Sequence, residues 1–389
     1  MKNRRNILFV TTGYPRFRGD RFGCFIKELT LELSKTYNVT VLAPHAPGYS
    51  IIDKEPGLTV YRLPYFFLCG SVAYGGGIPT NIKKWSVKLQ LPFFMISMTF
   101  WCTLLSFKKD LVHAQWGISA LYAWLKCKVF NTPLAVTFHG SDLHSSSFLR
   151  TVSKWSNSHS DASICVSEEQ FGYLGNNKAS IIPMPVDTVR FHNLKDPNQR
   201  LELKNELSIE NDHTLFLYVG YFIPLKNVDF LIECFAKTDT NSKLYLAGDG
   251  PEQEALQQLC TELNILDRVI FIGSVDYYDI HKWFQVADIH LLASDREGKP
   301  NVISQAMACS IPSISTSVGG VPELIEDAKT GFLLEKKHQS YVDKMNLLCN
   351  NSTLRKEMGE AALVKFNSLD LDLKSIAEKH VTVYNKLFK

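Results

Sequence analysis

Residues 297–320 (EGKPNVISQAMACSIPSISTSVGG) combine an acidic side chain with a backbone arrangement that could bind an anion. They follow an apolar run at residues 289–294 that predicts a buried strand, and a helical pattern begins near Val302. A strand, a short loop and a helix N-terminus in this order form an anion site, because unpaired backbone N–H groups and the helix dipole point at one place. Glu297 would not bind phosphate itself, but its carboxylate can bind hydroxyl groups of an adjoining sugar. The segment therefore indicates an enzyme that uses a nucleotide sugar.

Short apolar runs alternate with helical patterns along the whole chain. In the first half the runs cover residues 7–11, 39–43, 58–62, 111–114, 134–138, 162–166 and 180–184. In the second half they cover residues 215–219, 243–247, 269–272, 289–293, 312–315 and 332–334. Strands alternating with helices predict an α/β fold with a doubly wound parallel sheet, and the repetition predicts two such domains. Ligands of these sheets bind beyond the carboxyl ends of the strands, so we expect the active site in a cleft between the domains.

The bulk composition is that of a folded globular protein, with 45% hydrophobic and 21% charged residues. A chain of 389 residues fits two domains of about 190 residues each. We place the hinge at residues 192–200, a polar stretch that contains Pro197. The nine cysteines are scattered and never have CxxC spacing, which indicates reduced thiols in a cytoplasmic protein and disfavours structural zinc.

Charge is distributed unevenly between the two halves. Residues 1–190 carry 21 Lys and Arg against 11 Asp and Glu, and the remainder carries 21 against 28. A basic N-terminal half indicates an anionic partner. No nucleic-acid motif accompanies it, so an anionic membrane surface or an anionic acceptor is the favoured partner.

Residues 89–107 form an apolar segment that admits more than one interpretation. Its apolar core of about 17 residues is interrupted by Pro92, which makes it marginal for a membrane span. Lysines flank it on both sides, namely Lys83, Lys84, Lys88, Lys108 and Lys109. It is either a buried helix of the first domain or a helix partly sunk in a membrane interface, with its lysines on anionic head groups. A transmembrane span is the least favoured alternative, because a strand of the same sheet resumes at once.

Several short motifs, each weak alone, occur in an order and spacing that carry a family resemblance. They are Gly13-Tyr14-Pro15, Phe22-Gly23, His113-Ala114-Gln115-Trp116, His139-Gly140-Ser141-Asp142, Pro183-Met184-Pro185-Val186-Asp187 with Phe191, Val219-Gly220 with Lys226, Gly248-Asp249-Gly250-Pro251, the Glu297 segment and Gly319-Gly320. Over nearly its whole length the chain resembles the retaining GT-B-fold glycosyltransferases of the family 4 type, which include bacterial hexosyltransferases of surface-polysaccharide synthesis.

The resemblance implies two Rossmann-like domains, an acceptor-binding domain at residues 1–192 and a donor-binding domain at residues 193–372. A C-terminal helix at about residues 373–389 is expected to pack back on the first domain. The implied reaction is metal-independent transfer of a hexose, with retained configuration, from a nucleotide-diphosphate sugar (UDP or GDP) to a glycan or lipid-linked acceptor. No separate cofactor is implied, and the enzyme would be cytoplasmic, with a peripheral position on the inner face of the cell membrane as a further alternative.

The resemblance also implies roles for particular residues. Glu297 and His139 would orient the donor sugar, and Lys226 would stabilise the diphosphate together with the backbone N–H groups of Asn301 and Val302. A surface lysine and a structural histidine remain the alternatives for Lys226 and His139.

One glycine and two carboxylates are also predicted site residues, whereas two further glycines are interpreted as structural. Gly23 would let the N-terminal loop approach the donor, as only a residue without Cβ can. Asp20 and Asp142 are candidates for acceptor hydroxyls, with helix or loop capping as the alternative. Gly248 and Gly250 are interpreted as a turn before a helix at residues 252–263.

Two positions depart from the family pattern. The second donor-side glutamate, expected eight positions after Glu297, is Gln305 here, which can still hydrogen-bond ribose hydroxyls but without charge assistance. The arginine expected directly after Val219-Gly220 is Tyr221, so Lys226 would face the diphosphate with one cation fewer.

These departures support one alternative, a catalytically impaired member of the fold that serves as a partner in a glycan-assembly complex. A nicotinamide-dependent oxidoreductase is disfavoured, because neither half has a G-x-G-x-x-G after its first strand.

Overall fold

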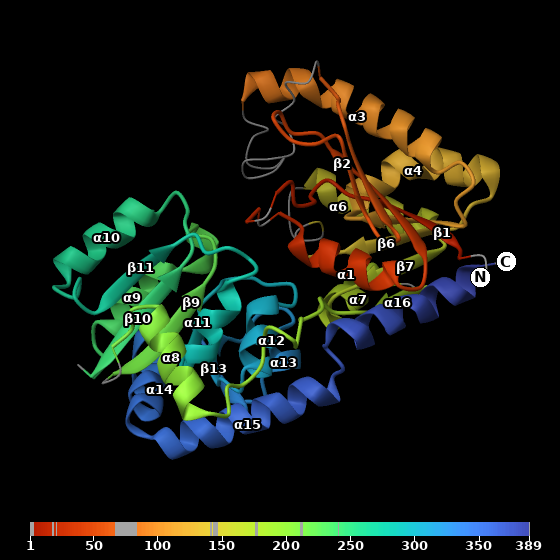
Figure 1. Ribbon diagram of the computed structural model, residues 1–389. Coiled ribbons are helices and arrows are strands. Elements are labelled where there is room, and N and C mark those ends of the chain that lie inside the picture. The colour runs from red at the N-terminus through yellow and green to blue at the C-terminus, as the bar shows by residue number, and fades with distance from the viewer. Residues whose placement is uncertain are drawn as a thin grey trace. The chain divides into compact units, whose positions relative to one another are not determined.

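The computed structural model describes residues 4–17, 19–20, 22–66, 84–140, 142, 147–175, 178–210, 213–239 and 241–388. The chain divides into two units, and each has its own sheet and its own core (Figure 1). The first unit comprises residues 1–185 and 373–389, and the second comprises residues 186–372. The predicted α/β fold with two doubly wound sheets is confirmed.

The first unit is built on an eight-stranded sheet with the order β3-β4-β2-β1-β5-β6-β7-β8. Its strands are β1 (Asn6–Val10), β2 (Asn38–Pro44), β3 (Ile52–Glu55), β4 (Leu58–Leu63), β5 (Leu111–Gln115), β6 (Leu134–Phe138), β7 (Ala162–Cys165) and β8 (Ala179–Ile181). Neighbouring strands are parallel except at the edge, where β3 pairs antiparallel with β4. The edge strand β3 was not among the predicted runs, because its sequence, IDKE, is mostly polar and exposed.

Helices cover both faces of this sheet. They are α1 (Cys24–Ser34), α3 (Trp85–Leu105), α4 (Gly117–Phe130), α6 (Ser147–His159), α7 (Glu168–Leu174) and α16 (Leu373–Leu387). Successive side chains of β1 enter two different cores, Ile7 and Phe9 with α1 and α16, and Leu8 and Val10 with α3 and α4. A strand buried on both faces reads as a continuous apolar run, which is why β1 was easy to predict.

The second unit has a six-stranded parallel sheet with the order β11-β10-β9-β12-β13-β14. Its strands are β9 (Thr214–Val219), β10 (Ser242–Ala247), β11 (Val269–Gly273), β12 (Ile289–Leu292), β13 (Ser313–Thr316) and β14 (Gly331–Leu334). Its helices are α8 (Pro197–Glu206), η1 (Pro224–Lys226, a 3-10 turn), α9 (Val228–Phe235), α10 (Gln253–Glu262), α11 (Ile280–Val286), α12 (Asn301–Ala308), α13 (Val321–Leu324), α14 (His338–Asn350) and α15 (Ser352–Ser368). With β9 as its first strand, this order is that of the dinucleotide-binding Rossmann sheets.

The two units separate in the sequence earlier than the hinge expected at residues 192–200. Val186 already forms a bridge with Asp372 of the second unit, and Phe191 is buried in the second core. The polar stretch that we interpreted as the hinge instead leads into α8, with Asp196 as the N-cap and Pro197 in the first turn. A proline in a polar run marks a helix start as readily as a linker.

Candidate functional site

The loops after β9 and β12 meet at the point where the strand order of the second sheet reverses. Parallel sheets bind ligands at this point, beyond the carboxyl ends of the strands. The backbone N–H of Asp295 donates to the carbonyl of Leu225 at 3.0 Å, and the side-chain amide of Asn227 donates to the carbonyl of Ala293 at 2.9 Å. Two loops that are 66 residues apart in the sequence are thereby held as one surface.

Lys226 and Glu297 form an ion pair on this surface. The Nζ of Lys226 lies 2.6 Å from Oε1 of Glu297, and the hydroxyl of Ser294 donates to the same oxygen at 2.6 Å. The Lys226 and Glu297 side chains remain 23% and 11% exposed. Within the described part of the chain, Oε2 of Glu297 has no hydrogen-bond donor. One carboxylate oxygen therefore fixes the loop, and the other can accept hydrogen bonds from a ligand.

The N-terminus of α12 follows directly after Glu297. Its N-cap is Pro300, whose ring has no hydrogen-bonding group, so its side chain cannot satisfy the first N–H groups of the helix. Asn301 and Val302 form the first turn, and Gln305 lies one turn further along and is buried. The loop is held from its other side as well, because Gly320 N donates to the carbonyl of Gly298 at 2.7 Å.

The structure thus brings together most of the residues predicted for the donor. Glu297, Lys226, Asn301 and Val302 lie on the loops and the helix start at the carboxyl edge of β9 and β12. Tyr221, in the position of the expected arginine, lies two positions after the end of β9, and its side chain is 44% exposed. Ser294, which the sequence analysis missed, orients Glu297; its position at the end of an apolar run was the available signal.

Gly248 and Gly250 have a structural role that the sequence analysis did not recognise. A Cβ on Gly248 would lie 1.8 Å from the carbonyl oxygen of Gly220, and a Cβ on Gly250 would lie 2.3 Å from that of Phe222. The backbone N–H of Phe222 also donates to the carbonyl of Asp249 at 2.7 Å. The interpretation as a mere turn was incomplete: the two glycines let the loop after β10 pack directly on the loop that carries Tyr221 and Lys226.

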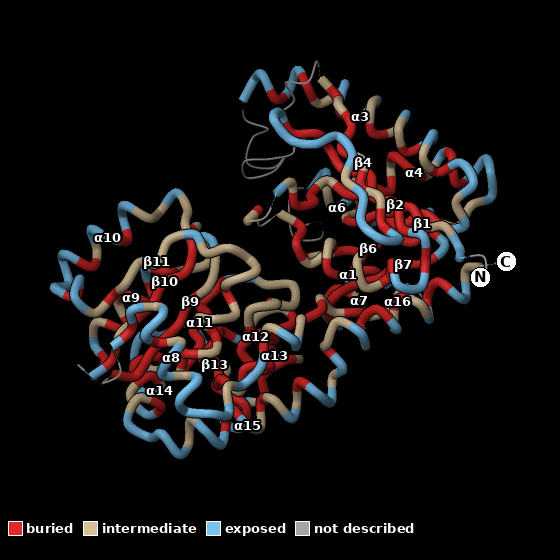
Figure 2. Tube along the Cα trace, viewed as in Figure 1, coloured by how far each residue is buried: buried red, intermediate tan, exposed pale blue. Residues whose placement is uncertain are grey.

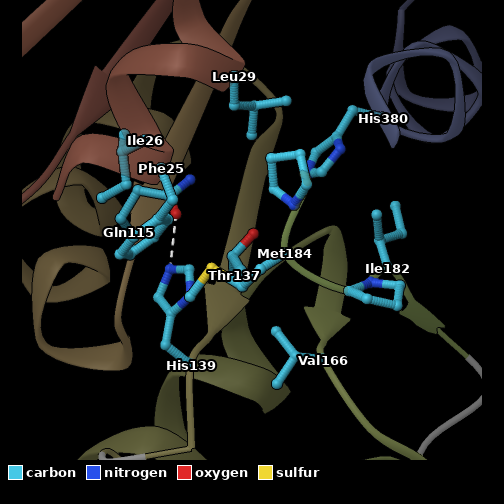
Figure 3. A pocket seen from close by; sticks show the side chains of 12 residues that line it. Phe25, Ile26, Leu29, Gln115, Thr137, His139, Val166, Ile182, Met184 and His380 are labelled. Carbon is cyan, nitrogen blue, oxygen red and sulfur yellow. Dashed lines mark hydrogen bonds between the residues drawn. The ribbon is translucent and has the colours of Figure 1, made fainter. Parts of the chain in front are cut away.

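His139 follows β6 in the first unit and lines a small cavity of about 20 Å³ (Figure 3). Its Nε2 lies 2.7 Å from Oε1 of Gln115, which can only accept, so the proton is on Nε2 and Nδ1 is an acceptor. Among the described residues, nothing donates to the buried Nδ1. The ring contacts Phe25 and Trp116, with centroid distances of 5.2 and 4.8 Å. Burial lowers the pKa of His139 to about 3, so the ring is neutral at physiological pH.

A chain of buried polar groups connects His139 to the C-terminal helix. The side-chain nitrogen of Gln115 lies 3.2 Å from Nε2 of His113, and Nδ1 of His113 lies 2.7 Å from the hydroxyl of Tyr384 in α16. The hydroxyl of Thr137 also lies 2.7 Å from Nε2 of His113. Burial lowers the pKa of His113 well below its usual value, so this ring is also neutral. Sequence analysis named His113 and Gln115 only as motif markers and missed Tyr384, which lies 271 residues from His113.

The two carboxylates predicted for acceptor hydroxyls both accept hydrogen bonds from other groups of the first unit. Asp142 is buried and accepts from the backbone N–H of His139 at 3.1 Å and of Gly117 at 3.2 Å, and burial raises its pKa to about 6. Asp20 is also buried and accepts from Nε of Arg16 at 2.6 Å. These contacts favour the capping alternative for both residues.

Gly23 is required for contacts inside the chain. It precedes α1 with φ at 75°, and a Cβ there would lie 2.3 Å from the carbonyl oxygen of Gly13. The close approach that glycine permits is therefore between two parts of the same loop, and a contact of Gly23 with the donor stays a prediction.

No group of three or more His, Cys, Asp or Glu side chains that could hold a metal ion occurs among the described residues. The described cysteines are all free, and all but Cys349 are buried.

Family models match both halves of the chain. The model described as "Glycosyl transferases group 1" matches residues 199–364, and the model described as "Glycosyltransferase Family 4" matches residues 25–190. The chain is 31% identical over 267 residues to the N-acetyl-alpha-D-glucosaminyl L-malate synthase of Bacillus anthracis, a match that covers 65% of this chain and 68% of that protein. It is 26% identical over 335 residues to the putative teichuronic acid biosynthesis glycosyltransferase TuaC of Bacillus subtilis, with 82% of each chain covered.

Solved structures share the fold. The sucrose-phosphate synthase from Thermosynechococcus elongatus matches with a TM-score of 0.85 at 20% identity, over 99% of both chains. Anabaena Alr3699/HepE in complex with UDP-glucose matches with a TM-score of 0.76 at 18% identity, over 98% of this chain and 99% of that one. With both halves matched by glycosyltransferase family models and two Rossmann-like sheets of this order, the chain belongs to the family 4 type of GT-B-fold glycosyltransferases.

Proposed function

We propose that the protein is a retaining hexosyltransferase that moves a hexose from a nucleotide-diphosphate sugar to a glycan or lipid-linked acceptor in surface-polysaccharide synthesis. The observation that carries this proposal is the Lys226–Glu297 pair at the reversal point of a Rossmann sheet, beside the start of α12. It combines an acceptor for sugar hydroxyls with donors for a diphosphate on one surface. The likeness to a teichuronic acid glycosyltransferase supports the class of acceptor, and a matching structure that holds UDP-glucose supports UDP as the nucleotide.

The reaction requires stabilisation of negative charge as the bond from the sugar C1 to the diphosphate oxygen breaks. Lys226 and the backbone N–H groups of Asn301 and Val302 would bind the diphosphate and lower that barrier, and this set of donors does not call for a metal. Glu297 would accept hydrogen bonds from the sugar hydroxyls through Oε2, and Gln305 would bind the ribose. The acceptor hydroxyl would form its bond to C1 on the same face and pass its proton to the departing phosphate oxygen.

His139 is proposed to bind a substrate hydroxyl through its buried acceptor nitrogen Nδ1. Its low pKa keeps this nitrogen unprotonated at neutral pH, so it can accept a hydrogen bond but cannot serve as a general acid there. Gly23, Asp20 and Asp142 would act indirectly, by holding the loops around it.

The alternative of a catalytically impaired partner protein keeps a specific observation in its favour. Tyr221 and Gln305 replace two charged donor contacts of the family pattern. A protein of that kind would bind no nucleotide sugar or would bind one without transferring the hexose.

A thermal-shift panel with UDP, GDP, ADP, CMP and their sugar conjugates tests whether the protein binds a nucleotide sugar at all, and the Glu297 variant below tests transfer. A ligand at a hundred times its dissociation constant adds about 2.7 kcal/mol of stability, so one base should stand out clearly. No shift with any of them would favour the impaired partner.

Substitution of Glu297 tests the catalytic role directly. Glu297→Gln keeps the size of the side chain but weakens its hydrogen bonds, so we expect kcat to fall about a hundredfold or more while the melting temperature changes little. Glu206→Gln is a matched control, because Glu206 pairs with Lys282 at the same 2.6 Å on an exposed surface. An active Glu297→Gln enzyme with unchanged kcat would contradict the proposal.

A further inference from the structure

Helix α3 is apolar on all sides but buried on only one. Its buried residues, Val87, Gln90, Phe94, Met98 and Cys102, recur every three or four positions and face the sheet. On the opposite side, large apolar side chains are exposed, six in the helix and Phe107 just after it. They are called here the outer face of α3: Trp85, Leu89, Phe93, Ile96, Phe100, Leu104 and Phe107. They also recur every three or four positions, which places them on one side of the helix. In Figure 2, exposed residues recur along the length of α3. Soluble proteins seldom expose a continuous stripe of this kind without a partner.

The inner side of α3 is fixed to the first unit. The Phe94 ring contacts Tyr65 and Tyr122 at centroid distances of 4.9 and 6.1 Å, and the hydroxyl of Ser97 donates to the carbonyl of Pro64 at 2.8 Å. At the C-terminal end, Nζ of Lys126 donates to the carbonyl of Ser106 at 2.6 Å. The helix is long and apolar enough to cross a membrane by composition alone. If α3 crossed a membrane, these contacts with the first unit would be lost. The contacts therefore favour a helix that stays packed on the first unit and lies at its surface.

The charges around the outer face favour a lipid surface over a protein one. Residues 84–109 include no Asp or Glu, and exposed lysines stand at both ends, namely Lys84, Lys88 and Lys108. Helix α4, whose Lys126 ties it to the end of α3, adds Lys128 and three exposed apolar side chains, Leu125, Val129 and Phe130. An apolar stripe with cations beside it suits a bilayer, where the stripe enters the acyl boundary and the lysines meet anionic head groups. Lys83 lies outside the described residues.

A groove of about 510 Å³ opens along the same face. It is lined by Phe93, Ile96 and Phe100 of α3 and by the segment Pro64, Tyr65 and Phe66. Apolar rings line a space of this size, which can receive part of an acyl chain next to the helix.

We propose that the outer face of α3 is a docking surface for an anionic lipid bilayer, on which the helix lies in the interface without spanning it. The proposal rests on the exposed stripe and its lysines and is independent of the donor chemistry proposed above.

Vesicle sedimentation tests this surface. We expect the protein to sediment with vesicles of phosphatidylcholine and phosphatidylglycerol at low salt and to bind phosphatidylcholine vesicles alone far more weakly. Ile96→Glu should lower the bound-to-free ratio at least about tenfold, because a carboxylate would enter the acyl boundary and repel the head groups. Raising the salt concentration should weaken binding of the natural protein, because the lysine contribution is screened.

Val364→Glu is the matched control, because Val364 is 69% exposed in the second unit and Ile96 is 68% exposed. We expect this variant to bind vesicles as the natural protein does, and melting curves of both variants show whether the fold is kept. Failure of the natural protein to bind the mixed vesicles at low salt would overturn the proposal. A dimer in sedimentation velocity that Ile96→Glu dissociates, with no vesicle binding, would instead assign this face to a second copy of the chain.

Discussion

A single carboxylate organises the loops at the proposed donor side of this glycosyltransferase. Oε1 of Glu297 is shared by Lys226 and Ser294, both at 2.6 Å, which holds the loop before α12 in one conformation. Lys226 uses one of its three N–H donors in this pair, and the others remain for a ligand. In the function proposed above, the pair would place an acceptor for hydroxyls and a cation for phosphate next to each other before any substrate arrives, which would preorganise the site.

The buried histidines lead us to expect that the stability of the fold depends on pH. Burial lowers the pKa of His290 to about 3 and of His380 to about 4, and the pKa of His113 falls as well. Below about pH 6.5 these histidines are protonated in the unfolded chain but stay neutral in the native state. The free energy of unfolding should therefore fall by about 1.4 kcal/mol for each histidine with every unit by which the pH is lowered. Asp142, whose pKa is raised to about 6, acts in the opposite direction below that pH, but it is one group against four, because burial also lowers the pKa of His139 to about 3.

Denaturant unfolding at pH 7.5 and pH 5 checks this expectation. We expect His290→Asn to lose part of the acid destabilisation, and His159→Asn, at an exposed histidine, to keep it. Equal stability of the natural protein at both pH values would contradict the assignment of neutral buried rings.

At the scale of elements, three loops of the second unit are fixed to one another through their backbones. The loop after β9 packs against Gly248 and Gly250 on one side and bonds to the loop after β12 on the other. Side chains at these positions would separate the loops, so glycine here sets how closely the elements approach. The conformation of the donor surface depends on this packing as much as on Glu297 itself.

Gly250→Ala tests the close approach. A Cβ at this position meets the Phe222 carbonyl oxygen at 2.3 Å, and backbone cannot move aside cheaply, so we expect a loss of about 2 kcal/mol or more and weaker nucleotide binding. Gly273→Ala is the control in the same unit, because it shares a positive φ but a Cβ there has no atom within 4 Å. Equal melting temperatures for the two variants would show that the loops can adjust.

At the scale of the whole molecule, the chain leaves the first unit at Pro185, builds the second, and returns through α16. The returning helix adds Ile376, Val383 and Tyr384 to the core beside β1, and its Tyr384 hydroxyl bonds His113. The first unit is therefore completed by the last residues of the chain, and the polar chain to His139 ends on this helix.

Tyr384→Phe removes the hydroxyl and little else. The buried N–H of His113 would lose its partner, which should cost about 1–3 kcal/mol of stability. We also expect lower transfer activity with unchanged nucleotide binding, because His113 helps to hold Gln115 and through it His139. Tyr173→Phe, at a partly exposed tyrosine of the same unit, should change stability by less than about 0.5 kcal/mol. A Tyr384→Phe variant as stable and as active as the natural protein would rule out this role.

Much of the fold and part of the site were predictable from the amino-acid sequence. Every predicted apolar run overlaps a strand, because strands of a sheet covered by helices are rich in apolar residues. Glu297 and the start of α12 were predictable because each follows a strand end, where local order in the chain decides its place. Lys226 was predicted only from the family resemblance, and its contact with Glu297 came from the structure. The edge strand β3 was not predicted, because its polar residues give no signal of burial. The start of the second unit was misplaced, because a polar run with proline fits a linker and a helix N-terminus equally well.

The sequence by itself thus determined the two parallel sheets, the family and the residues at the strand ends, since these depend on patterns within a few positions. Only the tertiary structure decided that Asp20 and Asp142 accept hydrogen bonds from other residues of the first unit. It also decided that Gly248 and Gly250 lie against the backbone after β9, and that the Tyr384 hydroxyl contacts His113. It also decided which side of α3 is covered, because that helix is apolar on every side and its own residues do not distinguish core from surface. The physical reason is the same in each case: contacts between distant segments depend on how the elements pack, and a linear pattern does not record packing.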